Sequence, residues 1–146
     1  MRPPTSPRLA AAAVAAAAAL ALAPASTASS PTAAACPSAS VVSAALKQKD
    51  KAPTSSTTTY GKTCTYAGSG LVPTKITFQK DTSATFAAGE KAASALGIVK
   101  VSGLGQAAWT TKAGGDLEVY KSGETIKILS PLTPAAELEA LARKLI

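Results

Sequence analysis

Two cysteines, Cys36 and Cys64, carry the most constrained chemistry of this sequence. They are the only cysteines in 146 residues, so a single intramolecular pairing exists. A nucleophilic or redox role finds no support, because the pair lacks Cys-x-x-Cys spacing and the chain contains no histidine to act as a base. We therefore predict a disulfide that closes a loop of about 29 residues and stabilises the fold by about 3–4 kcal/mol. Such a bond requires an oxidising compartment.

Other catalytic arrangements are hard to build from this composition. Without histidine the chain can form neither a His-based triad nor a His-rich zinc site, and two cysteines do not make a four-cysteine zinc site. A glycosidase needs two carboxylates that face each other across a cleft, and no pair stands out among the eight acidic residues. We expect no metal, no cofactor and no enzymatic activity. A hydrolase with an unrecognised site stays open as an alternative.

The segment 103–109 (GLGQAAW) is the most distinctive stretch of the chain. Two glycines before a strand could let a ligand approach the backbone, with the ring of Trp109 as an apolar wall. No Gly-Lys-Ser/Thr follows, so the segment is not a phosphate-binding loop. The candidate ligand or partner surface comprises Gly103, Gly105, Trp109 and Tyr120. The favoured alternative is structural: the glycines form a turn, and Trp109 anchors a core that contains few other aromatic side chains.

Positive charge gathers in one polar segment of a chain whose formal net charge is +7. Lys47, Lys49, Lys51 and Lys62 lie in or beside the stretch 47–62, which is rich in Thr and Ser. These lysines could contact an anionic surface such as an envelope polymer or phospholipid head groups. Nucleic-acid binding is not expected, because the segment lacks arginine and has one aromatic residue. A solvated loop is the simpler interpretation.

The N-terminal segment has the layout of a secretory signal peptide. Two arginines precede an apolar run over 9–23, and small residues follow Pro24. Cleavage is expected after Ala28, with Ala25 as the alternative. The apolar run is shorter than the roughly 20 residues that span a bilayer, so we expect no stable membrane span. The domain organisation is a signal peptide at 1–28, a disordered leader at 29–35 and a single α+β secreted domain at 36–146.

A lipid anchor at Cys36 is not expected. A bacterial lipobox abuts the apolar run and usually carries Leu three residues before its cysteine. Here 26–35 intervene, and Ala33 occupies that position. We therefore predict a protein that is secreted, either extracellular or associated with the cell envelope, without a lipid anchor.

Periodic hydrophobic residues predict three helices and several strands. The expected helices span 38–46, 84–96 and 134–146; the expected strands span 63–66, 75–80, 107–112, 116–121 and 125–129, with 98–101 as a further short strand. Strands that occur in hairpins favour an α+β fold with an antiparallel sheet. We predict a sheet of about five strands, with two to three helices packed on one face and one disulfide.

Local sequence signals predict the buried faces of the second and third helices and the N-cap of the third. The second helix should bury one narrow face of mostly small residues, made of Phe86, Gly89, Ala93 and Leu96. Thr133 should cap the third helix, with Pro134 at its first helical position. The leucines of the third helix recur at helical spacing and should be buried: Leu138, Leu141 and Leu145.

Several short motifs follow one another in an order that is typical of a known group of proteins. They are Cys36-Pro37 before a short helix, Cys64-Thr65-Tyr66, and GLGQAAW at 103–109 followed by Leu117 and Val119. This order resembles small secreted proteins and lipoproteins of unknown function in actinobacteria, where an acid often stands in place of Gln106 and many members carry a lipobox. The resemblance covers most of 36–146. It implies an envelope or extracellular α+β domain and carries over no catalytic residues.

The function that these features favour is binding. We expect a non-catalytic secreted domain that acts at or outside the cell envelope and binds an unidentified ligand or partner. A secreted protease inhibitor that uses the disulfide-bounded loop 47–62 is the alternative, motivated by small size and a bounded loop.

Overall fold

The computed structural model describes residues 35–68 and 72–146. The predicted signal peptide and all but the last residue of the predicted leader lie outside these residues. The elements in chain order are α1 (Ala39–Leu46), β1 (Thr54–Thr58), β2 (Gly61–Tyr66), β3 (Thr74–Lys80), α2 (Ser83–Ala93), the 3₁₀ turn η2 (Ser94–Leu96), β4 (Ile98–Lys100), β5 (Ala107–Thr111), β6 (Asp116–Lys121), β7 (Glu124–Leu129) and α3 (Ala135–Leu145).

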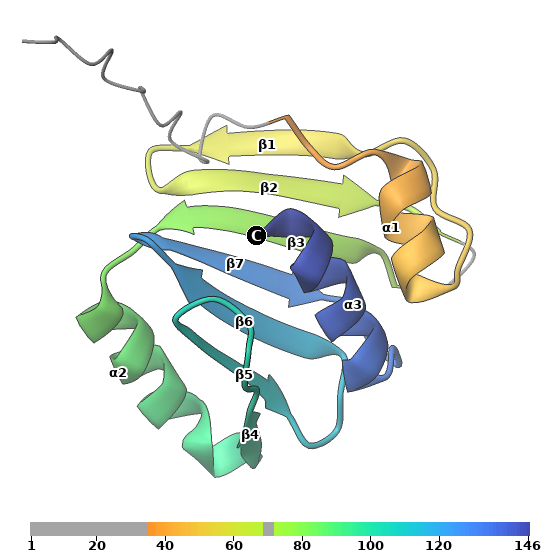
Figure 1. Cartoon of the computed structure of the whole chain (residues 1–146). Coiled ribbons are helices and arrows are strands. Elements are labelled where there is room, and N and C mark those ends of the chain that lie inside the picture. Colours follow the sequence, from red (N-terminus) through yellow and green to blue (C-terminus); the bar gives the residue numbers. More distant parts are fainter. Residues whose placement is uncertain (1–34, 69–71) are drawn as a thin grey trace, which may run out of the picture.

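The strands form one antiparallel sheet in the order β1-β2-β3-β7-β6-β5-β4 (Figure 1). After β3 the chain crosses through α2 to the far edge and returns through β4, β5 and β6, so that β7 pairs with β3 near the centre. The α+β class and the antiparallel sheet agree with the prediction. The sheet has seven strands rather than about five. The strand that sequence analysis interpreted as loop is β1, whose sequence TSSTT has no apolar alternation and whose residues are all exposed.

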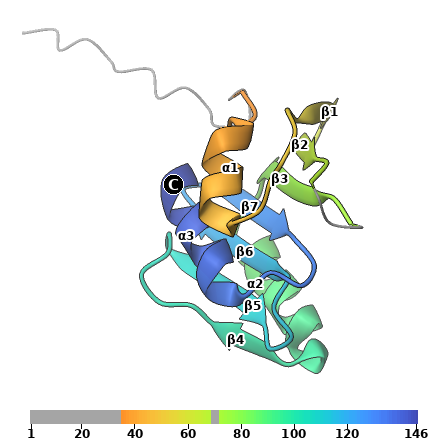
Figure 2. The same cartoon turned by 90° about the vertical axis from the view of Figure 1, so that its right-hand side faces the viewer.

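The helices cover both faces of the sheet. Helices α1 and α3 lie together on one face, whereas α2 lies on the opposite one (Figures 1 and 2). The prediction placed the helices on a single face. The difference arises at Tyr120, which alternates with the core residue Val119 along β6 and therefore points to the other side. There it meets Phe86 of α2, with ring centroids 5.6 Å apart.

The main core lies between the sheet and the pair α1 and α3. Its largest members are fully buried: Tyr66, Ile76, Leu104, Leu117, Ile128, Leu138 and Leu141. The predicted Cys36–Cys64 disulfide is present, with the two Cα atoms 5.7 Å apart, and it ties the short segment before α1 to β2. The two buried leucines of α3 confirm its predicted face, and Leu145 packs against the core while partly buried.

Two local predictions about helices are wrong. Phe86 is the one buried residue of α2, and Leu96, in the 3₁₀ turn that follows, is 71% exposed. The predicted face consists mostly of small residues, which bury little apolar area. Thr133 does not cap α3. It is buried, and its hydroxyl lies 2.8 Å from the Ser130 hydroxyl, so its oxygen is engaged in the core and Pro134 takes the cap position.

Candidate functional site

The surface predicted around Gly103 and Trp109 is largely structural in the folded chain. Gly105 has φ +57, and a Cβ there would lie 2.5 Å from the carbonyl oxygen of Tyr120. Glycine is therefore required by close packing as well as by backbone conformation. Trp109 is only 3% exposed, so its ring offers no free face to a ligand. The Tyr120 ring contacts Phe86 and stays partly exposed.

The loop around these glycines nevertheless borders a hollow of about 390 Å³. Its wall is mostly backbone and small side chains of 101–108. An ion pair between Lys100 and Glu90, 2.8 Å from Nζ to Oε1, lies at its rim. Arg143 of α3 donates to the carbonyl oxygen of Gly103 at 3.1 Å, which fixes the loop against the last helix. The ion pair and the Arg143 hydrogen bond thus hold the loop that borders the hollow in place.

The four lysines predicted to meet an anionic surface do not form one patch. Lys47 pairs with Glu137 of α3, with 3.2 Å between Nζ and Oε1. Lys49 and Lys51 are exposed in the segment after α1, next to a bridge that joins Asp50 to a residue beyond the end of β2. Lys62 lies in β2 near its opposite end. The sheet therefore separates Lys62 from the other three by most of a strand length.

Two carboxylates do come together, but around a lysine. Lys127 Nζ lies 2.6 Å from Glu118 Oε1 and 3.8 Å from Asp116 Oδ2 on the α2 face of the sheet. Burial raises the pKa of Asp116, while Lys127 and the backbone N–H of Leu117 oppose that rise. Burial lowers the pKa of Lys127, but the hydrogen bond and charge of Glu118, together with Asp116, raise it overall. The arrangement is a shared ion pair rather than two acids opposed across a cleft.

Two further findings concern the described part of the chain, one on metal-ligand clusters and one on membrane-spanning helices. Residues 35–68 and 72–146 contain no cluster of three or more His, Cys, Asp or Glu side chains suited to hold a metal ion. Within the same residues, no helix combines the length and apolar character needed to cross a bilayer.

A cleft of about 560 Å³ lies where the β1–β2 turn, the end of β3 and the start of α2 meet. We call it the Tyr60 cleft; its lining residues are Tyr60, Gln79, Lys80, Asp81, Thr82 and Thr85. Its volume falls within the range of about 300–1,000 Å³ that is typical of ligand sites. The Tyr60 ring is 80% exposed, which leaves its apolar faces open to a partner.

Backbone packing fixes the two walls of the Tyr60 cleft. A Cβ at Gly61 would collide with the carbonyl oxygen of Phe78, so glycine lets the hairpin tip lie directly on β3. The backbone N–H of Lys80 donates to the Tyr60 carbonyl oxygen at 3.1 Å, and the N–H of Asp81 donates to the Gly123 carbonyl oxygen at 2.9 Å. Tyr60 is thereby held beside the end of β3, although it is far from that strand in sequence.

The polar groups of the cleft are also held in place. Asp81 Oδ1 accepts from the N–H of Thr82 at 2.8 Å, and Oδ2 accepts from the Thr125 hydroxyl at 2.7 Å. The Thr82 hydroxyl caps α2 by accepting from the N–H of Thr85 at 3.1 Å and lies 2.9 Å from the Thr85 hydroxyl. Each carboxylate oxygen keeps a second lone pair for a further donor. The cleft therefore presents a positioned carboxylate and two positioned hydroxyls.

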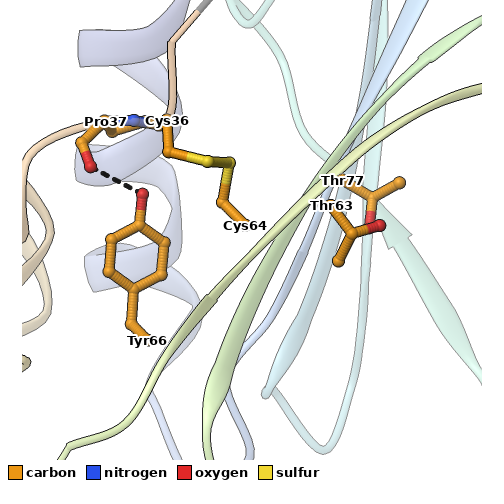
Figure 3. The surroundings of a disulfide bond; sticks show 6 residues. All are labelled: Cys36, Pro37, Thr63, Cys64, Tyr66 and Thr77. Atoms are coloured by element: carbon orange, nitrogen blue, oxygen red, sulfur yellow. Dashed lines mark hydrogen bonds between the residues drawn. A yellow bond between two sulfur atoms is a disulfide. The ribbon is translucent and has the colours of Figure 1, made fainter. Parts of the chain in front are cut away.

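The cleft borders an uncovered half of the sheet. Strand register places six hydroxyl side chains on the α2 face of β1, β2 and β3: Thr54, Ser56, Thr58, Thr63, Thr65 and Thr77. We call this the hydroxyl face; no helix of the described residues lies over it (Figure 2). Figure 3 shows Thr63 and Thr77 side by side, 3.1 Å between their oxygens, on the side of the strands away from Cys64 and Tyr66.

None of the residues that form the Tyr60 cleft was predicted as a site residue. Asp81 and Thr82 were expected only as candidates to cap the second helix, and Thr82 does so. The segment 47–62 was interpreted as a loop, and Tyr60 was noted only as its one aromatic residue. One usable signal was the Tyr60-Gly61 pair between two Thr-rich runs, which is compatible with a tight hairpin. Tyr60 lines one cleft with Gln79 and Asp81 because of the strand order, which no local pattern in the sequence indicates.

Comparisons with protein-family models, with curated proteins and with solved structures found no match for this chain.

Proposed function

We propose that this chain is a secreted, non-catalytic binding domain that acts at or outside the cell envelope, with the Tyr60 cleft as its ligand site. The observation that carries the proposal is the cleft itself. An aromatic ring that is 80% exposed stands opposite positioned polar groups, at the border of a sheet half that no described helix covers. Concave sites with a few convergent polar groups are where proteins usually bind ligands.

Export is supported by two features. The N-terminal pattern of two arginines, an apolar run and small residues is typical of a signal peptide. The Cys36–Cys64 disulfide fits an oxidising environment.

The lining of the cleft favours binding over catalysis. Asp81 is the one acidic residue among the six lining residues, and both of its oxygens already accept hydrogen bonds. Glycoside hydrolysis relies on two carboxyl groups that act as a pair. A single carboxylate fixed by two neighbours is better suited to orient a bound ligand.

The inhibitor alternative is less favoured. Five residues of 47–62 form β1 and pair along their whole length with β2, so the segment is in part an edge of the sheet rather than one free loop.

Co-sedimentation tests the proposed function. The folded domain is mixed with insoluble cell envelopes from an actinobacterium, and the bound fraction is measured for wild type, Tyr60→Ala and Leu132→Ala. Leu132 is fully exposed beyond the opposite end of β7, so it is a matched surface control. We expect wild type and Leu132→Ala to sediment with the envelopes and Tyr60→Ala to stay in solution. Absence of sedimentation, or equal sedimentation of all three, would overturn the proposal.

The same mixture tests the absence of catalysis. We expect no more soluble sugar or peptide to be released from the envelopes than in buffer alone. Release by wild type that disappears in Asp81→Asn would show that the cleft is an active site.

A further inference from the structure

We infer that the ligand of the Tyr60 cleft is an uncharged glycan, bound through a sugar ring stacked on Tyr60 and continued along the hydroxyl face. This inference rests on the proposed function and adds the chemical class of the ligand. It follows from the kinds of groups in the cleft, their balance of charge and the surface onto which the cleft opens.

The exposed ring of Tyr60 is suited to contact a ligand that has a flat apolar face. A pyranose ring presents such a face, because its axial C–H groups lie on one side while its hydroxyls project around the rim. Stacking of the aromatic ring against such a face removes apolar area from water, while the phenol oxygen stays in contact with solvent. The backbone contacts that hold the hairpin tip on β3 fix the position of the Tyr60 backbone before binding.

The polar groups around the ring match sugar hydroxyls, which both donate and accept. Asp81 offers acceptors whose positions are fixed by Thr82 and Thr125. The Gln79 side chain offers a donor and an acceptor, and it makes no side-chain hydrogen bond within the described residues. Groups that are already positioned lose less conformational entropy when a ligand binds.

The charge in the cleft favours an uncharged sugar. Lys80 and Asp81 are its two charged residues, and their formal charges cancel. A uronate, sulfate or phosphate polymer would gain from Lys80 but would meet the carboxylate of Asp81. Arginine, the side chain best suited to bidentate contacts with such anions, does not line the cleft.

The surroundings of the cleft fit a chain of sugars rather than a lone ring. Gln79 lines the cleft and, by register, lies on the same side of β3 as Thr77. Thr77 and Thr63 begin a row of small hydroxyl side chains that ends at Ser56 on the edge strand. By register Lys75 also lies on this face, opposite Thr65 at the end away from the cleft. The hydroxyls between Lys75 and the cleft can hydrogen-bond to successive sugars directly or through water. The cleft and the hydroxyl face therefore form one continuous polar track.

Nuclear magnetic resonance with neutral oligosaccharides tests the inference. The ¹⁵N-labelled domain is titrated with linear hexasaccharides of glucose, mannose, galactose, arabinose and N-acetylglucosamine. We expect at least one to shift the amide signals of Tyr60, Gln79 and Thr82 in a saturable way. Tyr60→Ala should weaken that binding by at least about tenfold, which corresponds to about 1.4 kcal/mol. Tyr60→Phe should retain it, because stacking needs the ring and not the hydroxyl.

Further variants and probes make the outcomes decisive. Gln79→Ala should weaken binding, whereas Leu132→Ala, far from the cleft, should leave it unchanged. An anionic polymer, such as a polyuronate or a polyglycerol phosphate, should shift these signals less than the best neutral glycan.

The two proposals can fail separately. If the domain sediments with envelopes in a Tyr60-dependent way but no neutral oligosaccharide shifts the cleft signals, the inference of an uncharged glycan is wrong and the binding function stands. Stronger shifts with the anionic polymer lead to the same conclusion. If Tyr60→Ala and wild type behave alike in both experiments, the cleft is not the site and both proposals fall.

Discussion

The phenol of Tyr66 donates a hydrogen bond of 2.7 Å to the carbonyl oxygen of Pro37, the residue that follows the disulfide-bonded Cys36 (Figure 3). Tyr66 is fully buried in the main core, and its oxygen is the polar tip of a side chain that is otherwise surrounded by apolar neighbours. The bond and the disulfide therefore fasten the same stretch of chain, just before α1, to strand β2 at two points.

Tyr66→Phe should destabilise the domain by about 1–2 kcal/mol, because the Pro37 carbonyl loses its partner and the ring is otherwise unchanged. Urea unfolding followed by circular dichroism measures the free energy. Tyr60→Phe is the control, since that residue is 80% exposed, and it should change the stability by less than about 0.5 kcal/mol. Equal stabilities of both variants would mean that the Pro37 bond contributes nothing.

The same residue predicts a loss of stability in alkali. Burial, with a further contribution from the charge of Asp50, raises the pKa of Tyr66 to about 12 from the ordinary 10.0. Between these two values the unfolded chain has lost the phenol proton while the folded chain retains it, so the stability falls as the pH rises. The difference in unfolding free energy between wild type and Tyr66→Phe should shrink over that interval. A difference that is independent of pH would contradict the assignment.

Removal of the disulfide should cost about 3–4 kcal/mol through the greater freedom of the unfolded chain. The double variant Cys36→Ala/Cys64→Ala should therefore unfold at much lower urea concentration than wild type. A reducing agent should bring wild type close to the variant and leave the variant unchanged. Unaltered stability of wild type under reducing conditions that break the bond would show that packing and the Tyr66 bond suffice.

Gly103 and Gly105 provide a matched pair of substitutions. Both have positive φ, +73 and +57, so alanine at either site should cost about 1–2 kcal/mol from the backbone alone. At Gly103 the added Cβ meets nothing within 4 Å, whereas at Gly105 it lies 2.5 Å from the Tyr120 carbonyl oxygen. Gly105→Ala should lose about 1–3 kcal/mol more, as overpacked sites do. Similar urea midpoints for both would contradict the packing role of Gly105.

Glu124 is a site where substitution should stabilise the domain. It is 6% exposed, its Oε1 has no hydrogen-bond partner among the described residues, and burial raises its pKa. At neutral pH the buried carboxylate is charged and lacks a partner at Oε1, which destabilises the folded state. Glu124→Met should therefore raise the free energy of unfolding by about 1 kcal/mol. On acidification the folded protein takes up the proton first, and the gain should shrink. Glu139→Met, at a partly exposed ion pair with Arg143, should have little effect at either pH.

Sequence alone determined the features that depend on local pattern or on counting. Two cysteines allowed one intramolecular disulfide, and it is present. The alternation of Ile76 with Thr77 and of Leu117 with Glu118 located β3 and β6, because one face of each strand is buried in the main core. The leucines of α3 showed its buried face for the same reason.

Tertiary structure decided what no local pattern encodes. Strand β1 has no apolar face and exists because its backbone pairs with β2, so hydrophobic periodicity could not reveal it. The side of the sheet that α2 covers depends on Tyr120 meeting Phe86 across a long stretch of chain. The Tyr60 cleft arises in the same way: the hairpin tip and the start of α2 become neighbours when β2 pairs with β3, and distant segments then share one surface. Pairing between strands is non-local, so the candidate site exists only in the folded chain.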